Sequence, residues 1–444
     1  MAPPREAAVL RVAKVRAGGH AYYLEVAGAT GTGIEAPGRW MGSGAPPMAM
    51  SGRVGADELA AVLAGEHPRT GEVLGTARSQ VRVAGFDMTF SAPKSVSLLH
   101  ALGDPEVVDA VAAGHEEAVR AAMSYVERRA LAVRRRGPAA PVAVPTSVDG
   151  VAAAGFVHRV SRALDPHLHT HVVVANVGRG PEGEWSALDG RGVYAHASAT
   201  DALYHVHLRD ELTRRLGVSW DPPDRGRADI AGIGPEVRRE FSRRAAEIAA
   251  HLAERELASG RARTVAGFVT RADKDPLLGA DDLRPEWEGR ALAVGFSPRR
   301  LDAVLDRSPR AAPLGVERHG DRLGLGAAMS GVVDNLHDVV TRRAVVRECG
   351  RAVAAGAPAT RVEEAADRLL EEMRPAPGHG GDHDGPGVAE RRHEVRSPTL
   401  ERGDDSHRRR AEIERSELSL LLSGRAMALD RTTDRRPDLG PGLG

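Results

Sequence analysis

Apolar and polar residues alternate over residues 81–90, which predicts a β-strand with two chemically different faces. Phe86, Met88 and Phe90 share the apolar face, because side chains two residues apart project to the same side of a strand. Asp87 projects from the opposite face. The pattern therefore predicts a core-facing strand that carries one acidic side chain on its other side.

Two more alternating segments, 151–160 and 168–176, predict a β-hairpin. The segment between them contains Asp165-Pro166, a pair that favours turns. A shorter alternation at 9–15 predicts a further strand near the start of the chain.

Helical periodicity dominates after the strands. The strongest pattern is amphipathic, begins with Asp104 as N-cap and Pro105 at the first helical position, and is predicted to end in the basic run 134–136. Later helical patterns cover 197–216, 235–258, 284–294, 299–305 and parts of 327–373. Strands first and helices later indicate an α+β fold with a helical extension.

Composition limits the classes of function. With 444 residues and 42% hydrophobic content, the chain can fill a large core. Cys349 is the single cysteine, which excludes internal disulfides and cysteine-based metal sites and favours a reducing cytoplasm. No apolar run reaches the roughly 18 residues of a membrane helix, so we expect no membrane insertion. Basic and acidic residues balance at 61 each, so any nucleic-acid binding must depend on a local surface.

Histidines on the predicted hairpin are the most informative feature. His169 and His171 are two residues apart, so on a strand both imidazoles project from one face, about 7 Å apart. His158 lies across from them if the two strands pair. His167 shares their face but lies at the turn, so we rank it below the other three.

These histidines predict a divalent metal site. The alternative is that each is an ordinary histidine of a half-buried sheet with a satisfied hydrogen bond. Neutral imidazoles fill a core poorly and charged ones repel each other, so three on one face favour the metal. Ligation without cysteine suits magnesium, manganese or zinc, and the spacing does not choose among them. A lone histidine such as His115 is better explained as structural.

The motifs around these residues resemble those of a known family. The first is FDMTFSAPKSVS, from Phe86 to Ser97, and the second runs from His158 to Asn176 and ends in HLHTHVVVAN. Both are similar to the motifs of conjugative relaxases of the large plasmid-transfer type (TrwC/TraI-like, MobF), within the histidine-hydrophobe-histidine (HUH) endonuclease superfamily. The resemblance covers roughly residues 10–300 and fades toward about residue 370.

The resemblance implies a two-layer palm, an antiparallel sheet with helices on one face and the histidines at its centre. The residues that match the metal ligands are His158, His169 and His171. Mg²⁺ or Mn²⁺ is the expected ion. Asp87 matches an aspartate that assists the metal site or the nucleophile, and Tyr22 and Tyr23 match tyrosines that attack the scissile phosphate.

The implied reaction is nicking and rejoining of single-stranded DNA at a transfer-origin nick site, through a 5′-phosphotyrosyl link. Lys94 and Arg162 are candidate phosphate contacts, and a solvated side chain is the alternative for each. Residues 30–34 hold no second tyrosine pair, so a second cleavage by the same chain is not expected. No lysine follows a glycine, which excludes the phosphate-binding loop of a helicase motor. We therefore expect no ATPase activity, and a separate helicase and transfer machinery as partners.

Three regions are predicted: a relaxase domain at 1–300, a helical extension at 301–373, and a disordered tail at 374–444, which is rich in Pro, Gly, His, Asp and Arg. Three alternative functions stay open. They are a non-cleaving single-stranded DNA-binding module derived from a relaxase, a rolling-circle replication initiator, and a metal hydrolase of small phosphoesters.

Overall fold

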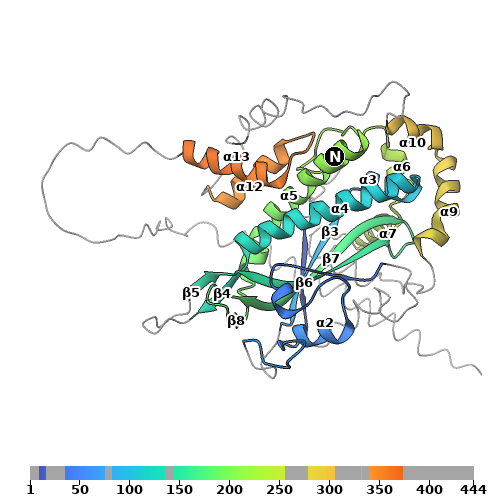
Figure 1. Cartoon of the computed structure of the whole chain (residues 1–444). Coiled ribbons are helices and arrows are strands. Elements are labelled where there is room, and N and C mark those ends of the chain that lie inside the picture. The colour runs from blue at the N-terminus through green and yellow to red at the C-terminus, as the bar shows by residue number, and fades with distance from the viewer. Residues whose placement is uncertain are drawn as a thin grey trace, which may run out of the picture. The chain divides into compact units, whose positions relative to one another are not determined.

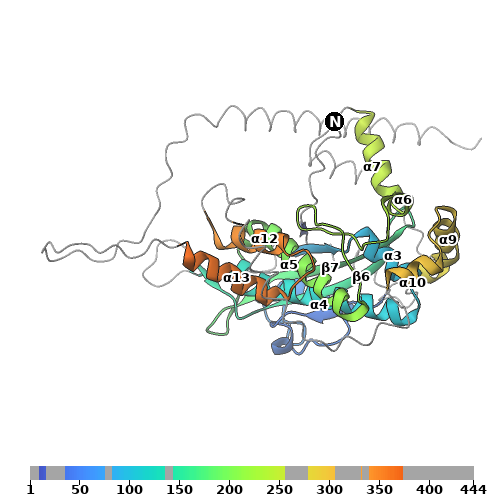
Figure 2. The same cartoon turned by 90° about the horizontal axis from the view of Figure 1, so that it is seen from above.

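The computed structural model describes residues 10–16, 36–75, 83–135, 144–255, 279–305, 332 and 340–373 (Figures 1 and 2). The chain divides into two compact units, one made of residues 1–242 and 275–374, the other of 243–274 and 375–444. The predicted hairpin and its histidines belong to the first unit. The predicted disordered tail lies outside the described residues.

The first unit contains a six-stranded sheet in the order β1-β3-β7-β6-β2, with β8 paired to β7, and its neighbouring strands are antiparallel. The strands are β1 (Arg11–Val15), β2 (Arg39–Met41), β3 (Gly85–Ser91), β6 (Gly150–Val160), β7 (Pro166–Arg179) and β8 (Trp185–Ser186). The predicted hairpin is confirmed as the β6–β7 pair. The strands predicted at 9–15 and 81–90 are β1 and β3, and residues 9, 81 and 82 lie outside the described part.

Helices cover one face of this sheet. Phe86, Met88 and Phe90 of β3 are buried there in one core with residues of α3, α4 and α5. In Figure 1, α4 and α5 run side by side across the sheet. The helices are α3 (Lys94–Leu102), α4 (Pro105–Tyr125), α5 (Arg191–Leu216), α12 (Arg342–Ala352) and α13 (Ala359–Glu372). The last two bury Val345 and Val362 in the same core, so the described part of the predicted extension packs with the sheet's helices.

The opposite face of the sheet carries a second, smaller apolar cluster. Helix α2 (Ala56–Leu63) and the nearby Met48 and Met50 pack there against Ala154 and Val173. His169 and His171 follow on the same face of β7, toward the β6–β7 turn, and are not members of that cluster. This face is therefore apolar at one end and polar at the other.

The long helix predicted from Asp104 ends earlier than expected. The Asp104 carboxylate accepts a hydrogen bond from Val107 N–H (3.0 Å), as an N-cap does. Helix α4 ends at Tyr125, a π-helical turn follows at Val126–Ala130, and the chain then enters β4 (Ala132–Arg135). The prediction that the basic run closes the helix was wrong. Val133 is fully buried in the core, and the backbone of β4 pairs with β5 (Val144–Ser147) instead of continuing a helix.

The helix predicted at 235–258 is two helices, α6 (Pro235–Glu240) and α7 (Arg243–Ala253). The break falls at Phe241, whose ring is fully buried with the Arg290 guanidinium 4.5 Å from its centroid. The predicted single helix was wrong because this packing depends on a distant helix, which helical periodicity does not report. That helix, α9 (Ala280–Ala293), and α10 (Pro298–Val304) confirm the two weaker patterns.

Candidate metal centre

The two central strands bring three histidines together. His158 of β6 is directly opposite His169 of β7, and His171 lies two residues farther along the same face. One ring nitrogen from each of the three lies within 4.8 Å of the others. Their ring centroids are 5.0 to 5.3 Å apart. The predicted convergence of imidazoles from neighbouring strands is confirmed.

Hydrogen bonds fix which ring nitrogen carries the lone pair in two of these histidines. His169 Nδ1 is 2.8 Å from the carbonyl oxygen of His167, which only accepts, so Nδ1–H donates and the lone pair is on Nε2. His171 Nδ1 is 2.9 Å from both carboxylate oxygens of Asp87 and donates in the same way. This carboxylate-to-imidazole arrangement orients metal-ligating histidines and raises their basicity as ligands.

The electrostatic surroundings favour the neutral form of His169. Burial, followed by the neighbouring imidazoles, lowers the pKa of His169 well below its ordinary value. A neutral imidazole has the free electron pair that a metal needs, whereas a protonated one has none. Three imidazole donors, two of them with a fixed Nε2 lone pair, therefore fit a divalent cation.

Asp87 lies where the strand pattern places it. It belongs to β3, pairs in register with Val173 of β7, and is buried with 8% of its surface exposed. The acidic side chain faces away from the helix-covered core, as the strand pattern predicts, and its carboxylate contacts His171. Thr89 of the same strand has its hydroxyl 3.3 Å from His171 Nδ1.

A buried polar chain lies on the other side of the histidine strand. Thr170, which alternates with the two histidines, faces the helices, and its hydroxyl is 2.8 Å from His115 Nε2. The other ring nitrogen of His115 is 2.8 Å from the hydroxyl of Tyr204 on α5. His115 is structural, as expected, but its two partners come from elements distant along the chain and could not be predicted from local patterns.

The two candidate phosphate contacts lie near the hairpin turn. Lys94, the first residue of α3, donates from Nζ to the carbonyl oxygen of Pro166 (2.6 Å). Burial lowers the pKa of Lys94 to about 8. Arg162 is half-buried in the turn itself. His167, also near this turn, has its ring stacked on that of His169 with centroids 4.4 Å apart, and is not one of the three converging ligands.

Tyr22 and Tyr23 lie outside the described residues. The chain has five tyrosines, and the other three are all on the helix-covered side of the sheet. The Tyr125 hydroxyl is 2.8 Å from His196 Nδ1, and that of Tyr204 is bonded to His115. The ring of Tyr194 packs edge-on against Phe86, with centroids 6.4 Å apart.

Comparison with known proteins identifies the family. The family model described as TrwC relaxase matches residues 7–294, and this range includes the whole sheet and all three converging histidines. The chain belongs to the TrwC relaxase family. It is 32% identical over 322 residues to the "Multifunctional conjugation protein TraI" of Escherichia coli strain K12, and 32% identical over 285 residues to a second Escherichia coli protein of that name. These alignments cover 67% and 61% of this chain but only 17% and 15% of the TraI proteins.

Solved structures of a TrwC relaxase are similar to this chain over 65% of its length. The metal-bound complex of the conjugative relaxase TrwC with oriT DNA is 28% identical, covers 65% of this chain and 100% of its own, and has a TM-score of 0.57. The TrwC complex with a 27-mer comprising the recognition hairpin and the cleavage site is 29% identical, with a TM-score of 0.56 and the same coverage. The predicted α+β relaxase fold is confirmed.

The converging histidines and the metal-bound relative together indicate a divalent metal ion at this centre. None of the helices in the described ranges is long and apolar enough to span a membrane.

Proposed function

We propose that this chain nicks and rejoins one DNA strand at a transfer origin by tyrosine transesterification, as a step of conjugative transfer. The observation that supports this most directly is the cluster of three converging histidines, with Asp87 bonded to His171, on the sheet of a TrwC relaxase fold. Two of the similar TrwC structures are complexes with oriT DNA, and a third is a complex with a DNA 27-mer that contains the cleavage site. Single-stranded DNA is therefore the proposed substrate.

His158, His169 and His171 would hold the metal, whose positive charge, when bound, polarises the phosphate oxygens and stabilises the negative charge that develops there. Asp87 accepts from His171 Nδ1 and so keeps the Nε2 lone pair of that ring directed toward the centre. We propose Mg²⁺ or Mn²⁺ as the ion. An all-imidazole set also suits zinc and copper, so metal analysis of the purified protein and activity with each ion identify the bound metal.

Tyr22 is the proposed nucleophile, with Tyr23 in an alternate or supporting role. This assignment follows the resemblance of the segment to the relaxase motifs, and Tyr125, Tyr194 and Tyr204 face away from the histidines. The phenolic oxygen, after losing its proton, forms a bond to phosphorus while the bond to the 3′ oxygen breaks, and the leaving oxygen takes up a proton. The product is a 5′-phosphotyrosyl link and a free 3′-hydroxyl. The new ester keeps the energy of the broken bond, so reversal rejoins the strand.

Several further assignments belong to this proposal. Arg162 and Lys94 are proposed DNA contacts near the hairpin turn. We propose that residues 1–300 form the relaxase domain, followed by the helical extension at 301–373. We propose that a separate helicase unwinds the DNA and that this chain acts together with the transfer machinery. We propose the cytoplasm as its location.

Covalent capture of DNA tests the proposal. Labelled single-stranded oligonucleotides tiled across the DNA next to the gene are incubated with the protein and Mg²⁺ or Mn²⁺. We expect one of them to yield a denaturation-stable protein–DNA adduct that is lost with a chelator and in Tyr22→Phe, and retained in the control Tyr194→Phe. An adduct lost only in Tyr23→Phe would reassign the nucleophile. DNA binding without any adduct would instead identify a non-cleaving binding module.

A further inference from the structure

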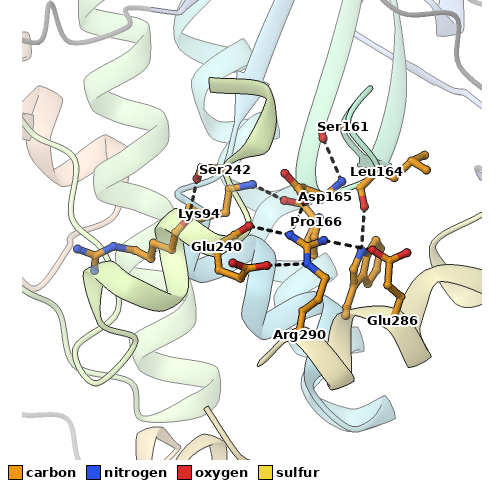
Figure 3. Close-up of polar contacts among 11 residues, drawn as sticks. Lys94, Ser161, Leu164, Asp165, Pro166, Glu240, Ser242, Glu286 and Arg290 are labelled. Carbon is orange, nitrogen blue, oxygen red and sulfur yellow. Dashed lines mark hydrogen bonds and ion pairs between the residues drawn. The ribbon is translucent and has the colours of Figure 1, made fainter. Parts of the chain in front are cut away.

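Three side chains from outside the hairpin hold the turn that joins its two histidine-bearing strands (Figure 3). Trp287 Nε1 donates to Leu164 O (2.9 Å), Arg290 Nη2 to Asp165 Oδ1 (3.1 Å), and Lys94 Nζ to Pro166 O (2.6 Å). Three successive residues, the last two of the turn and the first of β7, thus each accept a hydrogen bond from a different side chain. Two donors come from α9 and one from the first turn of α3. We call Lys94, Trp287 and Arg290 the turn clamp.

The turn has local hydrogen bonds of its own, from Asp165 N–H to Ser161 Oγ (3.1 Å) and from Leu164 N–H to Ser161 O (3.0 Å), but its backbone is also strained and its ladder irregular. Leu164 has a φ of 57°, a left-handed conformation that residues other than glycine disfavour. The register between β6 and β7 shifts between His158 and Val160, so the regular ladder is interrupted beside a metal ligand. The position of His158 relative to His169 therefore depends on the contacts that hold the turn as well as on the ladder that pairs the two residues.

Arg290 is itself rigidly held. Its guanidinium donates to the side chain of Glu240 (2.9 Å) and to the backbone carbonyl of the same residue (2.6 Å), and it lies against the ring of Phe241. The Asp165 carboxylate that it contacts is almost completely buried, with 1% of its surface exposed. A planar guanidinium with several bonds holds its partners at defined angles. Arg290 thus ties α6 and α9 to the turn.

We propose that the turn clamp, with Arg290 at its centre, sets the separation of His158 from His169 and thereby the affinity of the metal centre. This inference rests on the proposed function. His158 lies two residues before Val160, the last residue of β6, and His169 three residues after Pro166, the first of β7, so a rotation of the turn changes the distance between their rings. Metal–ligand distances tolerate deviations of only about 0.2 Å. Arg290 is a positioning residue and does not touch the metal.

Titration with Co²⁺, followed by its visible absorption bands, measures both affinity and ligand geometry. We expect Arg290→Met to weaken Co²⁺ binding about 10- to 100-fold and to alter the bands, the range seen when the groups that orient metal ligands are removed. Arg290→Lys, which keeps the charge and can make one bond, should recover part of this loss.

The matched control is Arg284→Met. Arg284 is on the same helix and donates to the carbonyl oxygens of Leu102 and Gly103, so it ties α9 to the end of α3 without touching the turn. Its loss should leave Co²⁺ affinity within about threefold of wild type, because it does not contact the turn. If α9 contributed only to the general stability of the fold, both substitutions would weaken Co²⁺ binding equally. Equal weakening in the two variants would overturn the proposal.

Hydrogen exchange of the metal-free protein separates the clamp from the metal centre. We expect faster exchange of the amides between His158 and His171 in Arg290→Met than in Arg284→Met. In a separate titration, the wild-type protein should bind Co²⁺ and His169→Ala should not. Unchanged exchange and affinity in Arg290→Met would refute the clamp alone. If the wild-type protein shows no Co²⁺ binding that depends on His169, the metal centre is refuted. The proposed role of the clamp in metal affinity is then refuted as well. If Arg290→Met does not fold, Trp287→Phe removes one clamp donor while keeping an aromatic side chain, and the same criteria apply.

Discussion

Replacing His115 with leucine removes the centre of the polar chain behind the histidine strand. The imidazole makes two hydrogen bonds of 2.8 Å, to Tyr204 and to Thr170, and all three side chains are buried. Leucine has a similar size but no polar atom, so both hydroxyls lose their partner. An unsatisfied buried polar group costs about 1–3 kcal/mol, so two of them predict a loss of roughly 2–6 kcal/mol in the free energy of unfolding at pH 7.

The same substitution has a defined pH dependence. Burial lowers the pKa of His115 to about 3 from an ordinary value of 6.5. As the pH falls below 6.5 the unfolded chain binds a proton that the folded chain excludes, so this residue's contribution to stability is complete above pH 6.5 and is lost toward pH 3. Each pH unit is worth about 1.4 kcal/mol. The difference between wild type and His115→Leu should therefore be about 2 kcal/mol smaller at pH 5 than at pH 7.

Urea unfolding followed by circular dichroism, with a chelator present so that metal binding does not contribute, measures both effects. The triple variant His115→Leu/Thr170→Val/Tyr204→Phe removes the hydroxyls as well as the imidazole, and it should regain most of the loss because no buried polar group is left unsatisfied. A single variant within 1 kcal/mol of wild type, or a triple variant no more stable than the single one, would refute the reasoning.

Two further substitutions address the metal centre and the helical layer. Asp87→Asn should weaken metal binding about 10- to 100-fold in calorimetric titration, because His171 loses a carboxylate acceptor, and wild-type affinity would show that Asp87 does not orient that ring. Arg209 is buried in α5 and donates to three backbone carbonyl groups that lie beyond that helix, so Arg209→Met should lower the free energy of unfolding by roughly 3–5 kcal/mol; a change below 1 kcal/mol in urea unfolding would contradict this.

Much of the candidate site was predictable from the sequence because a strand repeats every two residues. The alternation around His169 and His171 assigns both imidazoles to one face of β7 without any tertiary information. The same rule places Asp87 opposite the apolar face of β3. The turn signal at Asp165-Pro166 predicts that the preceding strand, which carries His158, pairs with the strand of His169 and His171. These are local regularities, and local sequence determines them.

Contacts between distant segments were decided only by the tertiary structure. Asp165 and Arg290 are 125 residues apart, and no periodicity relates a buried carboxylate in a turn to an arginine on a late helix. The break at Phe241 and the strand β4 have the same cause, because a side chain entering a core formed by other elements overrides helical propensity. The sequence by itself determined which residues share a face. Packing of separate elements decided which faces meet, since the energy of burial belongs to pairs of surfaces rather than to either segment alone.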